Sequence, residues 1–138
     1  MSRLHDGGEA NIGQVYLRNQ AHNTNLFLGL YTNATQPIEA DGMVQVTEVT
    51  GGGYARITLP PADWTQQGGQ TGEGGTRFDQ PQRIWTFSAA VGNVTGYFIT
   101  TTSTGTTGPL IVTEHFAAVV NVNQAGFEIR VTPRIDFR

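Results

Sequence analysis

A chain of 138 residues is long enough for one ordinary domain with its own core, and the lack of cysteine excludes disulfide frameworks, thiolate metal sites and cysteine nucleophiles. The net charge of -3 argues against a general binder of nucleic acid or of anionic membranes, because such binders carry a surplus of positive charge. All 8 basic residues of the Lys and Arg class are arginine, which fits either a host bias or ordered contacts with carboxylates and carbonyls of a partner.

Residues 1–24 predict an extended N-terminal arm. They contain a Gly-Gly turn and only one short apolar stretch, at Val15, Tyr16 and Leu17. The arm lacks the continuous apolar segment of a signal peptide, and no stretch of the chain approaches the length of a membrane span. We therefore expect a soluble protein with no membrane partner.

Residues 25–61 predict two features of a β domain. The run "NLFLGLY" at 25–31 has apolar residues on both faces, which is typical of a strand that is buried on both sides or covered by a partner. The glycines at 51–53 predict a turn or bulge with positive φ, followed by a half-buried strand from Tyr54 to Leu59 that Pro60 and Pro61 end.

The second half predicts a Gly/Gln-rich surface loop at 66–82 and then a series of strands. These strands occupy residues 83–90, 95–103, 109–122 and 127–137, with a break near Ala117 and a bulge or edge at Pro133. Glycine-bearing turns between β-rich runs are typical of an antiparallel sandwich or barrel. The fold class predicted for residues 25–138 is therefore all-β: a single antiparallel β-sandwich, jelly-roll-like by analogy.

The sequence predicts no catalytic residue, no metal and no cofactor, and therefore no enzyme. None of the serines lies in a G-x-S-x-G turn, and the histidines have no metal-ligand spacing. Glu114 and His115 are neighbours on one strand and so point to opposite faces. A pair of carboxylates for glycoside hydrolysis can be drawn from several acidic residues, but the sequence brings no pair to a defined separation.

Aromatic residues among Asn and Gln raise the question of a sugar-binding face. Trp64, Trp85, Tyr54 and Tyr97 suit stacking on pyranose rings, whereas the simpler interpretation places both tryptophans in the core. We favour the core interpretation.

Several stretches taken together resemble a known group of proteins. These are the turn-strand "GGGYARITL", the hairpin "AVGNVTGYFI", the "EHF" and the closing "IRVTPRIDF". Over residues 25–137 the chain resembles small all-β structural-module proteins of tailed bacteriophages. The resemblance implies a component of the virion, present in many copies, and it leaves open whether that component belongs to the head or to the tail.

The leading hypothesis is a capsid decoration (cement) protein that binds the major capsid protein and stabilises the head. It would be made in the bacterial host cytoplasm, lie on the capsid surface, form a homo-oligomer on the particle and make no direct contact with nucleic acid. The alternative is a tail, baseplate or host-adhesion component with a glycan-binding face. The residues expected to bind the partner are Leu4, Ile12, Val15, Tyr16, Leu17 and Arg18 of the arm, and Gln70, Arg77 and Phe78 of the loop.

Overall fold

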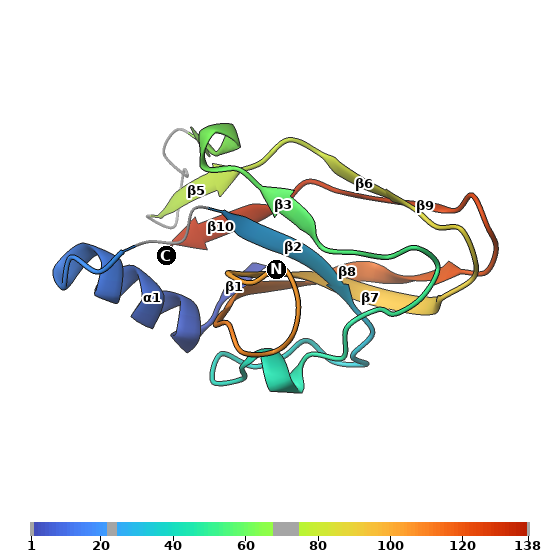
Figure 1. Ribbon diagram of the computed structural model, residues 1–138, viewed down its shortest axis with the longest axis horizontal. Coiled ribbons are helices and arrows are strands. Elements are labelled where there is room, and N and C mark those ends of the chain that lie inside the picture. The colour runs from blue at the N-terminus through green and yellow to red at the C-terminus, as the bar shows by residue number, and fades with distance from the viewer. Residues whose placement is uncertain (1, 22–24, 68–74, 138) are drawn as a thin grey trace.

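The computed structural model describes residues 2–21, 25–67 and 75–137 (Figure 1). Within these ranges the fold is mostly β with one short helix, and every strand pair is antiparallel, which confirms the predicted antiparallel, β-rich character of the chain. In chain order the elements are β1 (Ser2–Leu4), α1 (Asp6–Leu17), β2 (Leu26–Tyr31), η1 (Met43–Gln45), β3 (Ile57–Leu59), η2 (Pro61–Asp63), β4 (Thr65–Gln67), β5 (Thr76–Asp79), β6 (Arg83–Thr86), β7 (Gly92–Thr100), β8 (Leu110–Val122), β9 (Glu128–Val131) and β10 (Arg134–Phe137).

The strands form three sheets. A five-stranded sheet has the order β1-β8-β7-β2-β3, a three-stranded sheet has the order β10-β5-β4, and β6 pairs with β9 alone. Among the described residues none of the sheets closes into a barrel. Figure 1 shows β6 and β9 along one side of the molecule and β7 and β8 along the other.

The central part of the five-stranded sheet is buried on both faces. On one face the main core joins Leu28 and Leu30 of β2 to Trp85 of β6 and Ile129 of β9, so this core lies between the five-stranded sheet and the β6-β9 pair. On the other face a second cluster contains Tyr31, Met43, Val46, Phe98 and Leu110. The prediction that the run at 25–31 is covered on both sides is confirmed.

The glycines at 51–53 adopt the predicted conformation. Gly51, Gly52 and Gly53 have φ values of 82°, 58° and 74°, which side-chain-bearing residues rarely adopt. Gly52 also needs the space, because a Cβ there would lie 2.7 Å from Val91 Cγ1 and 2.9 Å from the carbonyl oxygen of Ala89. The strand that follows is shorter than predicted and contains only Ile57–Leu59, which pair with β2.

The prediction of an extended arm at 1–24 is wrong for residues 2–17. Ser2–Leu4 pair with Val112–Glu114 as the edge strand of the five-stranded sheet, and Asp6–Leu17 form a helix. The sequence hid this helix because Gly7, Gly8 and Gly13 lower its propensity and interrupt any apolar stripe. Gly8 has a packing role, since a Cβ there would lie 2.9 Å from the carbonyl oxygen of Ile111 on β8.

Three predicted boundaries in the second half also change. Thr65–Gln67 and Thr76–Asp79 pair as strands, so the predicted loop at 66–82 contains strand residues, and residues 68–74 lie outside the described residues. β8 runs through Ala117, but its pairing with β7 is irregular there, because Val94 pairs with Val120 and Gly96 with His115. Pro133 separates β9 from β10, which belong to different sheets.

Candidate functional site

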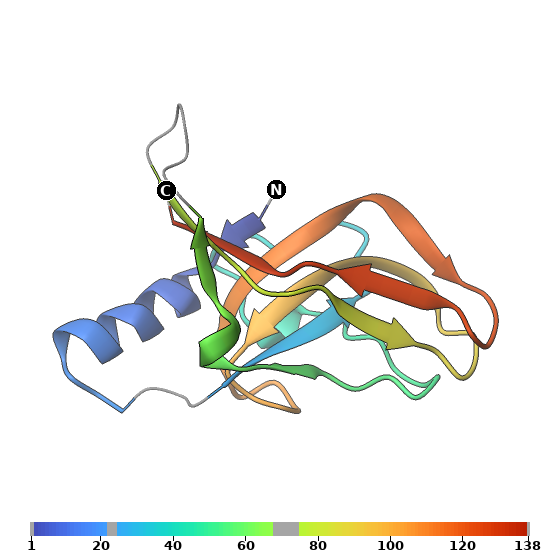
Figure 2. The ribbon, with the colours of Figure 1, turned by 90° about the horizontal axis from the view of Figure 1, so that it is seen from above.

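The most exposed large apolar side chains of the described chain lie at the end of α1. Tyr16 and Leu17 are 86% and 85% exposed, and Ile12, one helical turn before Tyr16, is 38% exposed. Figure 1 and Figure 2 both show α1 extending away from the sheets with this end outermost. We call Ile12, Tyr16, Leu17 and the adjacent Arg18 the helix-tip surface.

Arg18 and Val15 complete this end of the helix. The Arg18 guanidinium donates a 3.3 Å hydrogen bond to the Gln14 side chain and is exposed, so its charge faces solvent beside the apolar residues. Val15 is half-buried. The structure therefore brings four of the predicted partner-binding residues together on one helix and places a fifth, Arg18, at its C-cap, although the helix itself was not predicted.

Leu4 does not belong to this surface. It lies on β1, is half-buried and packs against the main core. Arg3 fixes the same strand from its other face by donating a 2.7 Å hydrogen bond to the carbonyl oxygen of Pro37. In the structure the contact of this side chain is with its own domain, and its contact with a partner stays a prediction.

The predicted loop residues lie on another element. Arg77 forms an ion pair with Asp79, with 3.0 Å between Nε and Oδ1, and Phe78 packs edge-on against Phe137 at 6.0 Å between ring centroids. Both are half-buried on β5, and they take their partners from within the chain. Gln70 lies outside the described residues.

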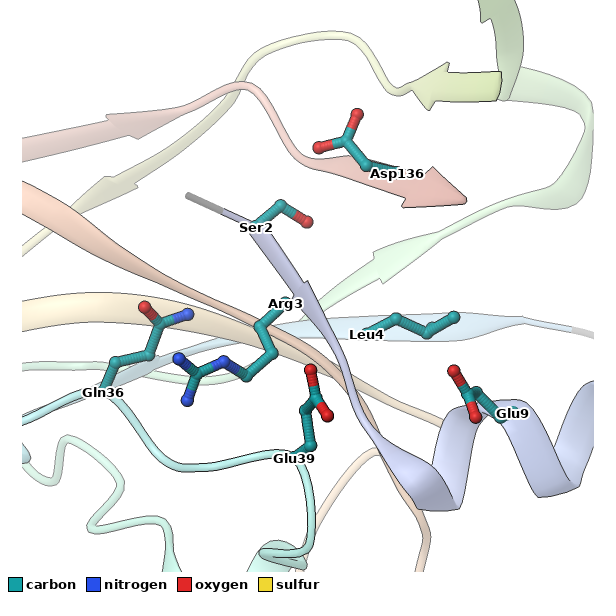
Figure 3. Close-up of a pocket in the computed structure, with 7 residues that line it drawn as sticks. All are labelled: Ser2, Arg3, Leu4, Glu9, Gln36, Glu39 and Asp136. Atoms are coloured by element: carbon teal, nitrogen blue, oxygen red, sulfur yellow. The ribbon is translucent and has the colours of Figure 1, made fainter. Parts of the chain in front are cut away.

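A polar pocket that the sequence did not indicate lies beside β1. Its volume is about 300 Å³. Figure 3 shows its lining side chains grouped around β1, which are Ser2, Arg3, Leu4, Glu9, Gln36, Glu39 and Asp136. Three carboxylates against one guanidinium make the lining acidic, so it suits hydrogen-bond donors and cations better than anions. The spacing of these residues in the sequence does not predict such a pocket, because they come from β1, α1, the segment at 36–39 and β10.

His5 connects β1 to α1 and is completely buried. Its Nδ1 lies 3.2 Å from the carbonyl oxygen of Asp41, which can only accept, so Nδ1 carries the proton and Nε2 accepts from the Thr113 hydroxyl at 2.8 Å. Burial lowers the pKa of His5 below its ordinary value of 6.5, and the positive charge of Arg3 acts in the same direction, while the Asp41 and Glu39 carbonyls and the Asp41 carboxylate oppose them. The ring is a neutral structural group that holds the N-terminal segment against β8.

Arg56 has a buried side chain that also serves the fold. The side chain of Arg56 is 2% exposed and binds both carboxylate oxygens of Glu48, at 2.8 and 2.7 Å. Its guanidinium also donates hydrogen bonds to the carbonyl oxygens of Thr102, at 2.8 Å, and Gly105, at 2.7 Å. Burial and the neighbouring Glu48 raise the pKa of Tyr54, which donates to the same carboxylate at 2.8 Å. The composition suggested that arginines make ordered contacts with carboxylates and carbonyls of a partner. Arg56 makes such contacts within its own chain.

The aromatic residues considered for a sugar-binding face are mostly internal. Trp85 is buried in the main core and donates its indole N–H to the carbonyl oxygen of Ala55 at 2.8 Å. Tyr97 is buried as well and donates to Glu114 at 2.7 Å, whereas Trp64 is half-buried against the same core. The core interpretation is confirmed for Trp85.

Glu114 and His115 lie on opposite faces of β8, as predicted. Glu114 accepts from Tyr97 of the main core, and the His115 ring lies 3.2 Å from the hydroxyl of Tyr31 in the second cluster. The two side chains therefore do not share one site.

Comparison with known proteins gives no match, neither to a family model nor to a curated protein. Among the described residues, α1 is too short and too polar to span a bilayer, and no other helix is long enough.

Proposed function

We propose that this chain is a structural protein of a tailed-phage virion, a capsid decoration (cement) protein whose body is a small β-sandwich. It attaches to the major capsid protein through the helix-tip surface and stabilises the head. The single observation that carries this proposal is the exposure of Tyr16 and Leu17 on a helix that extends away from the sheets.

The chemistry of the helix-tip surface suits a protein groove. Ile12 and Tyr16 are four residues apart and so lie on one face of α1, which is the spacing by which amphipathic helices place apolar side chains into a hydrophobic groove. Burying one large apolar side chain is worth roughly 1.5 to 3 kcal/mol before the costs of ordering. Two or three such side chains give a modest attachment per copy, and a shell with many copies multiplies it.

Other partner classes fit the chain less well. Nucleic acid is disfavoured by the net charge of -3. A glycan-binding face built from the aromatic residues considered above is disfavoured, because Trp85 and Tyr97 lie in the core.

The experiment that tests the proposal is a decoration assay. Purified protein is mixed with particles that lack it, and bound copies are located and counted by cryo-electron microscopy. We expect regular occupancy on the capsid, lost when Tyr16→Ser and Leu17→Ser are combined. Val44→Ser is the matched control, because Val44 is 76% exposed on a different element.

Two results would overturn parts of the proposal. Density at the tail instead of the shell would assign the chain to the tail. Equal occupancy by the double variant and the control would remove the helix-tip surface from the attachment.

A further inference from the structure

The second half of β8 has a free edge. β1 covers this edge of the five-stranded sheet only at Val112–Glu114. From Phe116 to Val122 no described residue pairs with β8 on this edge. On the opposite edge the pairing with β7 is itself interrupted between His115 and Val120. The backbone of this segment, which we call the open edge (residues 116–122), is therefore short of ladder partners.

The open edge is uncharged and mostly apolar, with the sequence "FAAVVNV". Ala117, Ala118 and Val119 are exposed, and Val119 is 55% exposed. Phe116 and Val120 instead pack against the main core. Natural proteins protect free edges with lysine, proline or charged bulges, because an unprotected edge is a template for another strand. The open edge contains no lysine, no proline and no charged residue.

β9 lies beside the open edge. A groove of about 160 Å³ separates the two, and its lining residues are Phe116, Val120, Glu128, Ile129 and Arg130. Glu128 and Arg130 face outward and form an exposed ion pair at 2.8 Å, while Ile129 between them points into the core. The groove therefore has an apolar floor and one charge of each sign at its rim.

We propose that the open edge is a dimer interface, on which the same segment of a second copy pairs antiparallel about a two-fold axis. The register that pairs the whole open edge with itself is centred on Val119, so that Val119 lies opposite the partner's Val119. Phe116 then lies opposite the partner's Val122, and Ala118 opposite the partner's Val120. Each pair joins side chains on the same face of the sheet, and no pair contains a charge.

The rim of the groove supports a second copy as the occupant. Because Ile129 lines the same groove as Phe116 and Val120, an axis beside Val119 also passes near Ile129. The same rotation brings Glu128 toward the partner's Arg130 and Arg130 toward the partner's Glu128. Opposite charges thus meet twice, whereas an unrelated strand would need its own matching pair.

The first test is a disulfide across the axis. The chain has no cysteine, so Val119→Cys supplies its only thiol. Directly opposed residues of an antiparallel pair have Cα atoms about 4.5 to 5.5 Å apart, which is within the range that a disulfide can bridge. We expect rapid formation of a covalent dimer by Val119→Cys under mild oxidation and not by the control Val44→Cys, and we expect the unmodified protein to sediment as a dimer.

The second test is a charge exchange at the rim. Glu128→Arg alone places two arginines together across the axis, and Arg130→Glu alone places two glutamates together. Each single change is expected to weaken dimerisation by about tenfold. The double variant Glu128→Arg with Arg130→Glu restores opposite charges both within the chain and across the axis, and is expected to restore the dimer. A mixture of the two single variants, in which each chain has lost its internal ion pair, is also expected to dimerise because opposite charges then meet only across the axis, which a merely structural role of the pair would not produce.

These tests need no capsid, so their outcome is separate from that of the decoration assay. A monomer at about 100 µM, a concentration at which even weak specific dimers are populated, would overturn the proposal. Equal cross-linking rates for Val119→Cys and Val44→Cys would overturn it as well. Dimers that tolerate both single charge changes would place the interface elsewhere.

Discussion

Replacing Arg56 tests how much the buried Arg56–Glu48 pair stabilises the fold. Arg56→Met keeps most of the aliphatic length but removes both contacts to Glu48, the hydrogen bonds to the carbonyls of Thr102 and Gly105, and the guanidinium that lies 5.1 Å from the Phe98 ring centroid. The carbonyl of Thr102 and the loop that contains Gly105 then lose their shared donor.

The magnitude follows from the burial of the two partners. Removing one member of a buried ion pair costs about 3 to 5 kcal/mol, because the other charge stays behind without its partner. Glu48 is 27% exposed and still accepts from the Tyr54 hydroxyl, so water and this hydroxyl compensate part of the loss. We therefore expect Arg56→Met to lower the free energy of unfolding by about 3 kcal/mol, at the low end of that range. For a domain of this size the melting temperature falls by roughly 10 °C.

The assay is urea unfolding followed by the fluorescence of buried Trp85. Arg18→Met is the matched control, because it removes the same charge from an exposed position and should cost less than about 0.5 kcal/mol. Adding Glu48→Gln to Arg56→Met should recover part of the loss, since the amide oxygen still accepts from Tyr54 and no charge is left behind. Equal unfolding free energies for Arg56→Met and Arg18→Met would refute the assignment of a structural role to the pair.

Two further changes probe the backbone and the buried histidine. Gly52→Ala should lower the melting temperature more than Gly51→Ala, because both glycines have positive φ but only a Cβ at position 52 would lie against Val91 and Ala89. Equal losses of melting temperature in the two variants would mean that the close contact at position 52 is relieved at no cost. His5 is held neutral by burial, so the folded state binds this proton less readily than the unfolded state. The contribution of neutral His5 to stability is therefore complete above pH 6.5, and it falls as the pH drops below 6.5 until the lowered pKa of the folded state is passed. Urea midpoints measured at successive pH values should show a flatter fall in His5→Gln. An unchanged pH dependence in His5→Gln would assign the acid sensitivity to other groups.

The strands were predictable where side chains alternate. Ile129 and Val131 point inward on β9 while Glu128 and Arg130 point outward, as period-two patterning requires. The positive φ values at 51–53 were also predictable, because three successive glycines have few other structural uses.

The N-terminal helix could not be predicted from local preference. Gly8 weakens an isolated helix, yet its missing side chain is what lets α1 approach the backbone of β8 at Ile111. Tertiary contact thus overrides propensity here. The strand at Ser2–Leu4 was hidden for a related reason, since its partner Val112–Glu114 lies more than a hundred residues away in the sequence.

The candidate site was predictable only in part. The apolar cluster of Val15, Tyr16 and Leu17 was visible as a short stretch in a polar segment, and two of its three members are highly exposed. The polar pocket beside β1 was not visible, because Glu9, Glu39 and Asp136 approach one another only after β1, α1 and β10 have packed.

The position of β1 between α1 and β8 has a mechanical consequence. A load that reaches the start of α1 enters the body at Leu4 and His5, where β1 is held by its pairs with Val112–Glu114 and by the buried imidazole, and at Gly8, which packs against Ile111 of β8. Ladder hydrogen bonds run perpendicular to the strands, so a pull along β1 strains all of them at once instead of opening them one after another. The three-residue strand therefore acts as a shear joint, which resists a tangential force better than its length suggests.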